Sequence, residues 1–159
     1  MLNILTGPPK DPTRDRELVD SLMNSQGLKI VCGGSTSEMV ARETGVEVEI
    51  EQNPTSLIAP PRYAIEQIDL VTEGAVTLNQ AYNLLSEDVD RLKEDSGVTE
   101  LCLLLNVADR VNFLVGDASN QGSDDIAFRQ RGVLTRRVLI PLFVEKLRQM
   151  GKLVTVKNV

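Results

Sequence analysis

Four short apolar segments of this sequence each run directly into a turn that contains glycine. Branched apolar residues dominate each of them, which is typical of a strand covered on both faces. They are residues 2–6 before Gly7, residues 28–32 before Gly33-Gly34, residues 68–72 before Glu73-Gly74, and residues 111–115 before Gly116-Asp117. Segments of helical spacing separate them. The sequence therefore predicts a three-layer, Rossmann-like α/β fold, with a mostly parallel (mixed) sheet between helices on both faces.

The helices are expected where capping residues precede apolar residues at helical spacing. Asp11 before Pro12 is typical of a helix start, and Ser35-x-x-Glu38 and Thr77-x-x-Gln80 are typical capping boxes. These three helices are expected to end at Gly27, at Gly45 and near Gly97. Two more cover residues 98–108 and 133–150, the second kinked by Pro141, and residues 153–156 form a closing strand. No linker or repeat divides the 159 residues, which fit one domain.

Residues 46–51 alternate strictly between apolar and acidic side chains. Val46, Val48 and Ile50 fall on one face of a strand and the glutamates on the other. Because such a strand has one face in water, we expect it at an edge of the sheet. The proline-containing residues 53–62 are expected to form an irregular crossing loop.

Composition excludes several classes of protein. No apolar run approaches the ~20 residues of a membrane span, and the start of the chain lacks the features of a signal peptide, so a cytoplasmic location is expected. The net charge of −6 argues against non-specific nucleic-acid binding. Histidine, the commonest general base, is missing, and the two cysteines, Cys32 and Cys102, are expected to be reduced thiols.

The glycine turns are the candidate ligand site. The carboxyl ends of parallel strands share one edge of the sheet, and ligands of open α/β sheets bind there. After Cys32, the turn Gly33-Gly34-Ser35-Thr36 leads into a helix whose free N–H groups and hydroxyls suit an anion. The same turn also fits a plain strand-to-helix connection capped by Ser35. The predicted ligand-binding residues are Gly7, Cys32, Gly33, Gly34, Ser35, Thr36, Thr72, Glu73, Gly74, Gly116, Asp117 and Asn120.

Other reactive groups have two readings each. Cys32 beside a helix start is either a reactive thiolate or an inert buried thiol. Glu73, Asp117, Asp124 and Asp125 either hold a divalent cation or are solvated. The arginines near the last helix either catch an anion or cover a solvated face; they are Arg129, Arg131, Arg136 and Arg137. We predict no catalytic residue, no metal site and no cofactor.

Three segments together resemble a known family. They are Leu5-Thr6-Gly7-Pro8-Pro9-Lys10-Asp11, Val31-Cys32-Gly33-Gly34-Ser35-Thr36 with Val40-Ala41-Arg42-Glu43, and Ile68-Asp69-Leu70-Val71-Thr72-Glu73-Gly74 with Thr77-Leu78. They are similar to the C-terminal domain of bacterial serine/threonine phosphatases related to stage II sporulation protein E. The tail also fits, with Gly116, the helix-borne arginines and Gly151-Lys152-x-Val154-Thr155, so the resemblance covers nearly the whole chain.

This resemblance implies a non-catalytic domain attached to a phosphatase. In the family, aspartates in Asp-Gly steps hold two metal ions in a core that lies upstream, whereas this chain contains no Asp-Gly step. Family members often carry Pro and His after the Gly116 strand. Residues 117–122 here depart from that pattern, which puts a family function of that loop in doubt.

Three functions follow as hypotheses. The first is a regulatory, ligand-sensing domain that binds a small anionic ligand and modulates an adjoining serine/threonine phosphatase. The second is a protein-interaction or homodimerisation module without a small ligand, with residues 46–51 and 98–108 as its surfaces. The third is an independent enzyme on a nucleotide or sugar phosphate, with Glu73 or Asp117 as the base.

Overall fold

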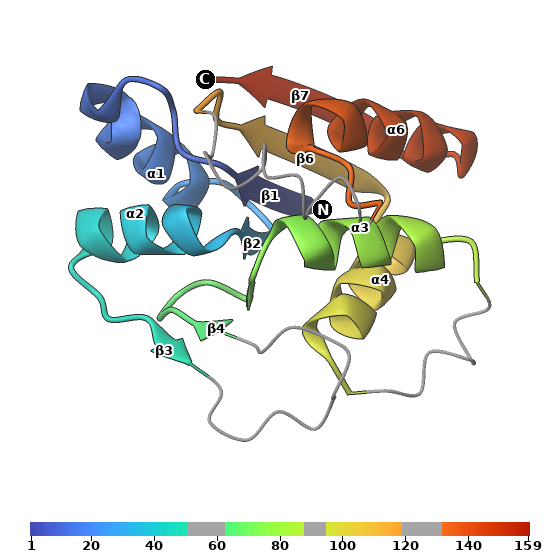
Figure 1. Ribbon diagram of the computed structural model, residues 1–159, viewed down its shortest axis with the longest axis horizontal. Coiled ribbons are helices and arrows are strands. Elements are labelled where there is room, and N and C mark those ends of the chain that lie inside the picture. Colours follow the sequence, from blue (N-terminus) through green and yellow to red (C-terminus); the bar gives the residue numbers. More distant parts are fainter. Residues whose placement is uncertain (51–62, 88–94, 119–131) are drawn as a thin grey trace.

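The computed structural model describes residues 1–50, 63–87, 95–118 and 132–159. Within them a seven-stranded sheet has the order β3-β4-β5-β2-β1-β6-β7 (Figure 1). Its strands are β1 (Leu2–Thr6), β2 (Leu28–Cys32), β3 (Glu49–Ile50), β4 (Tyr63–Ala64), β5 (Leu70–Thr72), β6 (Arg110–Val115) and β7 (Leu153–Asn158). The neighbours β5, β2, β1, β6 and β7 pair in parallel. The pairs β3–β4 and β4–β5 are antiparallel and lie at one edge of the sheet.

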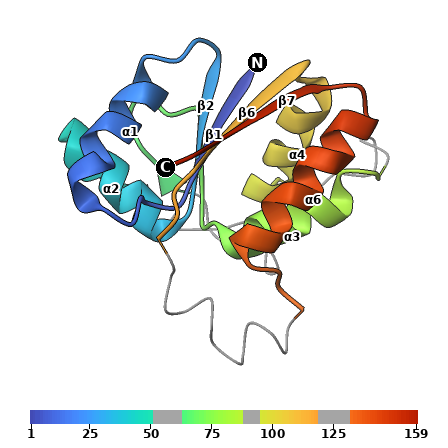
Figure 2. The same ribbon diagram turned by 90° about the horizontal axis from the view of Figure 1, so that it is seen from above.

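Helices cover both faces of this sheet, as predicted (Figure 2). They are α1 (Asp15–Met23), α2 (Gly34–Thr44), α3 (Ala75–Leu84), α4 (Gly97–Val107) and α6 (Arg136–Gln149). The helices α1 and α2 lie on one face, and α3, α4 and α6 lie on the other. The three-layer, Rossmann-like α/β architecture is therefore confirmed. None of the helices in the described ranges is long and apolar enough to cross a membrane.

The core is divided between the two faces of the sheet. In β1, Leu2 and Ile4 pack toward α3, α4 and α6, whereas Leu5 packs toward α1 and α2. All three are at most 1% exposed, which explains why the central strands are apolar on both sides. Phe143 of α6 fills the first of these cores, with its ring centroid 6.1 Å from that of Phe113.

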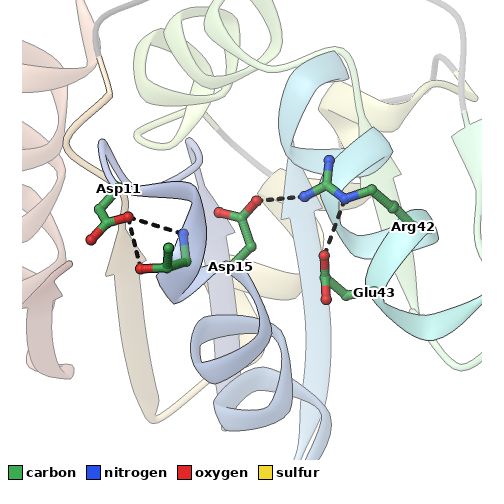
Figure 3. Close-up of polar contacts among 5 residues, drawn as sticks. Asp11, Asp15, Arg42 and Glu43 are labelled. Carbon is green, nitrogen blue, oxygen red and sulfur yellow. Dashed lines mark hydrogen bonds and ion pairs between the residues drawn. The ribbon is translucent and has the colours of Figure 1, made fainter.

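An ion pair joins α1 and α2, the two helices on the face of the sheet opposite α6 (Figure 3). The carboxylate of Asp15 in α1 is buried, and its Oδ2 lies 2.5 Å from an Nη atom of Arg42 in α2. Arg42 also reaches the carboxylate of Glu43, at 3.1 Å. Just before α1, Asp11 accepts a hydrogen bond from the N–H of Thr13 and caps a short 3-10 helix, Pro12–Arg14, so the predicted helix start is confirmed.

The two predicted capping boxes are wrong. The helix α2 begins at Gly34 with Gly33 as its N-cap, and α3 begins at Ala75 with Gly74 as its N-cap. Gly33 and Gly74 have φ of 126° and 123°, so each strand turns sharply, and the N-cap lies two residues earlier than predicted in α2 and three residues earlier in α3. Ser35 and Thr77 therefore lie inside the first turn of a helix.

Several other boundaries also differ from the prediction. The helix α1 ends at Met23, four residues before Gly27, and α3 ends at Leu84. The helix α6 begins at Arg136 rather than 133, with Pro141 inside it. The predicted strand 46–51 is reduced to β3, although β3 does lie at the sheet edge, and β4 beside it was not predicted. The predicted loop 53–62 lies outside the described residues.

Candidate functional site

The four glycine turns lie along one edge of the sheet, as predicted, because the strands that precede them are parallel neighbours. Neighbouring turns are joined by backbone hydrogen bonds. The N–H of Gly33 donates to the carbonyl of Thr72 (3.0 Å), and that of Gly34 donates to Glu73 (3.1 Å). The N–H of Gly116 likewise donates to Thr6 (3.1 Å). The carboxyl ends of β5, β2, β1 and β6 thus form one continuous edge.

Glycine at this edge is required mainly because the turns touch one another. A Cβ atom on Gly74 would lie 2.6 Å from Cα of Gly33, and one on Gly116 would lie 2.1 Å from the carbonyl oxygen of Pro8. Gly34 differs, because it is exposed and a Cβ atom there would meet nothing within 4 Å. Close packing therefore explains Gly74 and Gly116, and only Gly34 leaves open space.

The hydroxyls at the start of α2 are mostly used inside the protein. Thr36 is buried and its Oγ1 accepts the N–H of Gly7 at 2.9 Å. Ser37 is also buried and donates to the carbonyl of Gly33. Among the hydroxyls predicted for an anion site here, only that of Ser35 lies on an exposed residue. The start of α2 is thus a smaller candidate site than the sequence suggested.

Cys32 is a free, buried thiol in this structure. It is 1% exposed, and burial raises the pKa of its thiol to about 12. The nearby Thr72 hydroxyl lowers this pKa in part, while the negative charge of Glu73 raises it further. The thiol is therefore protonated at neutral pH, so the geometry does not favour the reactive-thiolate reading. Cys102 is also a free, buried thiol.

The two carboxylates at the edge each accept a backbone N–H. Glu73 Oε2 accepts from Val76 at 3.2 Å, in the first turn of α3. Asp117 Oδ1 accepts from Lys10 at 2.7 Å, in the turn after β1. No group of three or more Cys, Asp or Glu side chains suited to a metal ion occurs in the ranges that the structure describes. Asn120, Asp124, Asp125, Arg129 and Arg131 lie outside those ranges.

A cleft of about 990 Å³ lies between α6 and the strands β6 and β7. Its apolar lining comes mainly from α6, β6 and β7, namely Val115, Ile140, Pro141, Val144 and Val156. Three arginines of α6 also line it, Arg136, Arg137 and Arg148, together with the acidic residues Asp117 and Glu145. Two predicted site residues, Gly116 and Asp117, therefore meet two of the predicted arginines.

Arg136 is the anchored member of this group. Its guanidinium donates to the carbonyl of Ala118 at 2.5 Å and lies where a side chain on Gly7 would project. Burial lowers its pKa, the charge of Arg137 lowers it further, and Asp117 acts in the opposite direction. Arginine nevertheless stays charged in a protein. The neighbouring Arg137 is exposed.

One end of the cleft, at Gly116 and Asp117, lies beside the place where the order of the strands reverses. The chain passes from β1 outward through β2 to β5 on one side, and from β6 to β7 on the other. Ligands of open α/β sheets bind at this switch point, outside the carboxyl ends of the strands. Gly7 and Gly116 flank it. The sequence placed both glycines at one edge of the sheet, but it contained no signal that Arg136 lies beside them.

Comparison with known proteins finds no match for this chain among family models, curated proteins or solved structures. The similarity to the phosphatase family thus stays a prediction from the three sequence segments.

Proposed function

We propose that this chain is a non-catalytic, ligand-sensing domain that binds a small anion in the cleft at the start of α6. The observation that carries the proposal is the position of Arg136 and Arg137. They line a cleft whose end at Gly116 adjoins the switch point between β1 and β6. Small-molecule sites of open α/β sheets occur at this place.

The chemistry of the cleft suits an anion with an apolar part. The first N–H groups of the 14-residue helix α6 and its dipole favour negative charge at the arginine end. Arg137 is exposed and in reach of solvent, while Arg136 is fixed by the carbonyl of Ala118. The apolar side chains of Ile140 and Val144 continue the lining beyond the arginines. A ligand with a carboxylate or phosphate group attached to a small apolar group would match this arrangement of arginines and apolar side chains.

We further propose that ligand binding modulates an adjoining metal-dependent serine/threonine phosphatase. The support is the sequence resemblance, whose three segments include the turns at Gly7, Gly33 and Gly74. The turn at Gly7 lies against Arg136 at the start of α6, and the other two turns share its edge of the sheet, so a ligand at α6 would lie next to that edge. Under this proposal the chain by itself hydrolyses no phosphoester.

Thermal denaturation with candidate anions tests the binding. Phosphate, nucleotides, phosphorylated metabolites and dicarboxylates are added in turn, and a ligand at 100 times its Kd should stabilise the fold by about 2.7 kcal/mol. The melting temperature then rises by roughly 5–10 °C for a chain of this size. Arg137→Gln should remove most of the rise. The matched control is Arg16→Gln on α1, where the arginine side chain is 71% exposed and remote from the cleft. If no anion at millimolar concentration shifts the melt, the proposal is wrong.

The alternative of an interaction module has one specific observation in its favour. Apolar side chains are exposed on two outer elements, with Ile50 of β3 at 60% and Val107 of α4 at 77%. Exposed apolar patches mark contact surfaces when they are contiguous. Light scattering at high protein concentration decides whether these surfaces join two copies.

A further inference from the structure

The strand β7 has an open edge that the anion proposal does not use. It is the outermost strand of the sheet, and no described helix or strand lies beyond it (Figure 1). The N–H of Leu153 donates to Asp109 and that of Val159 donates to Val115, so the odd-numbered residues face β6. Because backbone groups alternate along a strand, the N–H and C=O groups of Val154, Val156 and Asn158 point outward.

This edge is accessible to a partner strand. The residues from Thr155 to Asn158 are all exposed, and Val156 is 39% exposed. Arg148 donates to the carbonyl of Val154 at 3.1 Å, at the beginning of the strand. In the part of the chain that the structure describes, it is the only side chain that bonds to the outward backbone groups of β7. Among the described residues, the outward N–H and C=O groups of Val156 and Asn158 therefore have no partner, and such groups are the template for strand addition.

The cleft runs beside this edge and has a definite order of chemistry. Arg137, Pro141, Val144 and Arg148 follow one stripe of α6 at helical spacing, and all four line the cleft. The stripe thus has a cation at each end and apolar groups between them. Its ends are about 16 Å apart along the helix axis. The first and fifth residues of a strand are about 13 Å apart, and the long arginine side chains span the difference.

We propose that an extended acidic peptide adds to the edge of β7 as a further strand, with alternate side chains directed into the cleft beside α6. An acidic side chain lies near Arg137, an apolar one near Val144, and a second acidic one near Arg148. These are alternate positions of one strand, so the spacing is acidic-x-apolar-x-acidic. This inference goes beyond the binding of a small anion, because it uses the backbone of β7.

A second copy of the chain fits the same edge less well. Pairing of β7 with itself across a two-fold axis is antiparallel, so the Arg137 end of one α6 faces the Arg148 end of the other. Like charges then meet at both ends of the paired cleft. An acidic peptide instead places carboxylates there, which is why we choose it as the occupant.

The test uses a fluorescent seven-residue peptide with glutamate, valine and glutamate at its second, fourth and sixth positions and threonine elsewhere. Fluorescence anisotropy should show saturable binding. N-methylation of the peptide N–H groups that face β7 should weaken binding about tenfold or more, whereas N-methylation in the opposite register should change it less than about twofold. Equal effects of the two registers would overturn strand addition. Replacement of both glutamates by lysine should abolish binding.

Two variants of the protein complete the test. Val156→Pro removes an outward N–H and leaves the β6–β7 hydrogen bonds intact, so it should weaken the peptide about tenfold. Arg137→Gln should weaken the peptide several-fold, and Arg16→Gln should not. If the peptide binds Arg137→Gln as tightly as it binds the wild type, the proposed contact between a peptide carboxylate and Arg137 is wrong. If light scattering shows a dimer and Val156→Pro dissociates it, the partner of the β7 edge is a second copy of the chain, and the peptide proposal is wrong. If the wild-type protein binds the peptide but no small anion raises its melting temperature, the proposed function is wrong and the peptide proposal stands.

Discussion

The guanidinium of Arg136 fills the space into which a side chain on Gly7 would project. A Cβ atom on Gly7 would lie 2.1 Å from Arg136 Nη1. Gly7 follows β1 and Arg136 begins α6, so the contact packs the first strand's turn against the last helix. Arg136 also bonds to the carbonyl of Ala118, just after β6. One side chain thereby joins both sides of the switch point.

Gly7→Ala should therefore destabilise the fold and disturb the proposed anion site. The φ of +81° at this position disfavours alanine, and the new methyl group must also displace Arg136. We expect a loss of about 1–3 kcal/mol in the free energy of unfolding, measured by urea denaturation. Gly7→Ala should cost less in an Arg136→Ala background, because the clash is then absent. An equal cost in both backgrounds would show that only the backbone conformation matters.

Two glycines at the same edge should respond oppositely to alanine. Gly74 has a positive φ and a Cβ there would lie 2.6 Å from Cα of Gly33, so Gly74→Ala should cost about 2 kcal/mol or more. Gly34 begins α2, has open space around it and lacks a positive φ, so Gly34→Ala should be neutral or stabilise by up to about 1 kcal/mol. Chemical denaturation of the two variants measures the difference. A large loss from Gly34→Ala would contradict this account of the edge.

The sequence predicted β1 and β2 to the residue because apolar runs bounded by glycine leave little choice of boundary. It failed at the starts of α2 and α3. The patterns at Ser35 and Thr77 are local, whereas the sharp turns at Gly33 and Gly74 depend on contact between the two turns. A capping-box pattern thus occurred in both helices without forming a cap.

The candidate site was predictable only in part for the same reason. The shared edge of the glycine turns follows from parallel strands, and the sequence supported it. The cleft depends on Arg136 packing against Gly7 and on β7 lying beside α6, which are contacts between segments far apart in the chain. No spacing along the sequence records such contacts. Ligand binding by the predicted residues stays a prediction.

The buried cysteines should make the fold sensitive to alkaline pH. Burial raises the pKa of Cys32 from 9.0 to about 12 and that of Cys102 to about 11. A folded-state pKa above the unfolded one gives stability that is complete below the unfolded pKa and is lost as pH rises toward the folded pKa. The free energy of unfolding should therefore fall between about pH 9 and pH 12.

The variant Cys32→Ala isolates this effect from other groups that titrate at high pH. Its stability should fall less steeply above pH 9 than that of the wild type, although alanine leaves a small cavity and lowers stability at neutral pH. Urea denaturation at several pH values measures both slopes. Parallel slopes for the two proteins would mean that the Cys32 thiol does not contribute.

Replacing Arg42 should lower the free energy of unfolding more than replacing Arg16, which forms an exposed ion pair on the same face of the sheet. Its guanidinium contacts Asp15, whose side chain is only 8% exposed (Figure 3). Arg42→Gln leaves that buried carboxylate without its cation, and since Arg42 is itself 59% exposed, solvent screens part of the loss. We expect a measurable fall in the free energy of unfolding, larger than that of the control. The matched control is Arg16→Gln, which breaks an exposed pair with Asp20 and should cost at most about 0.5 kcal/mol. Equal costs in thermal or urea denaturation would show that the burial of Asp15 adds nothing to this ion pair.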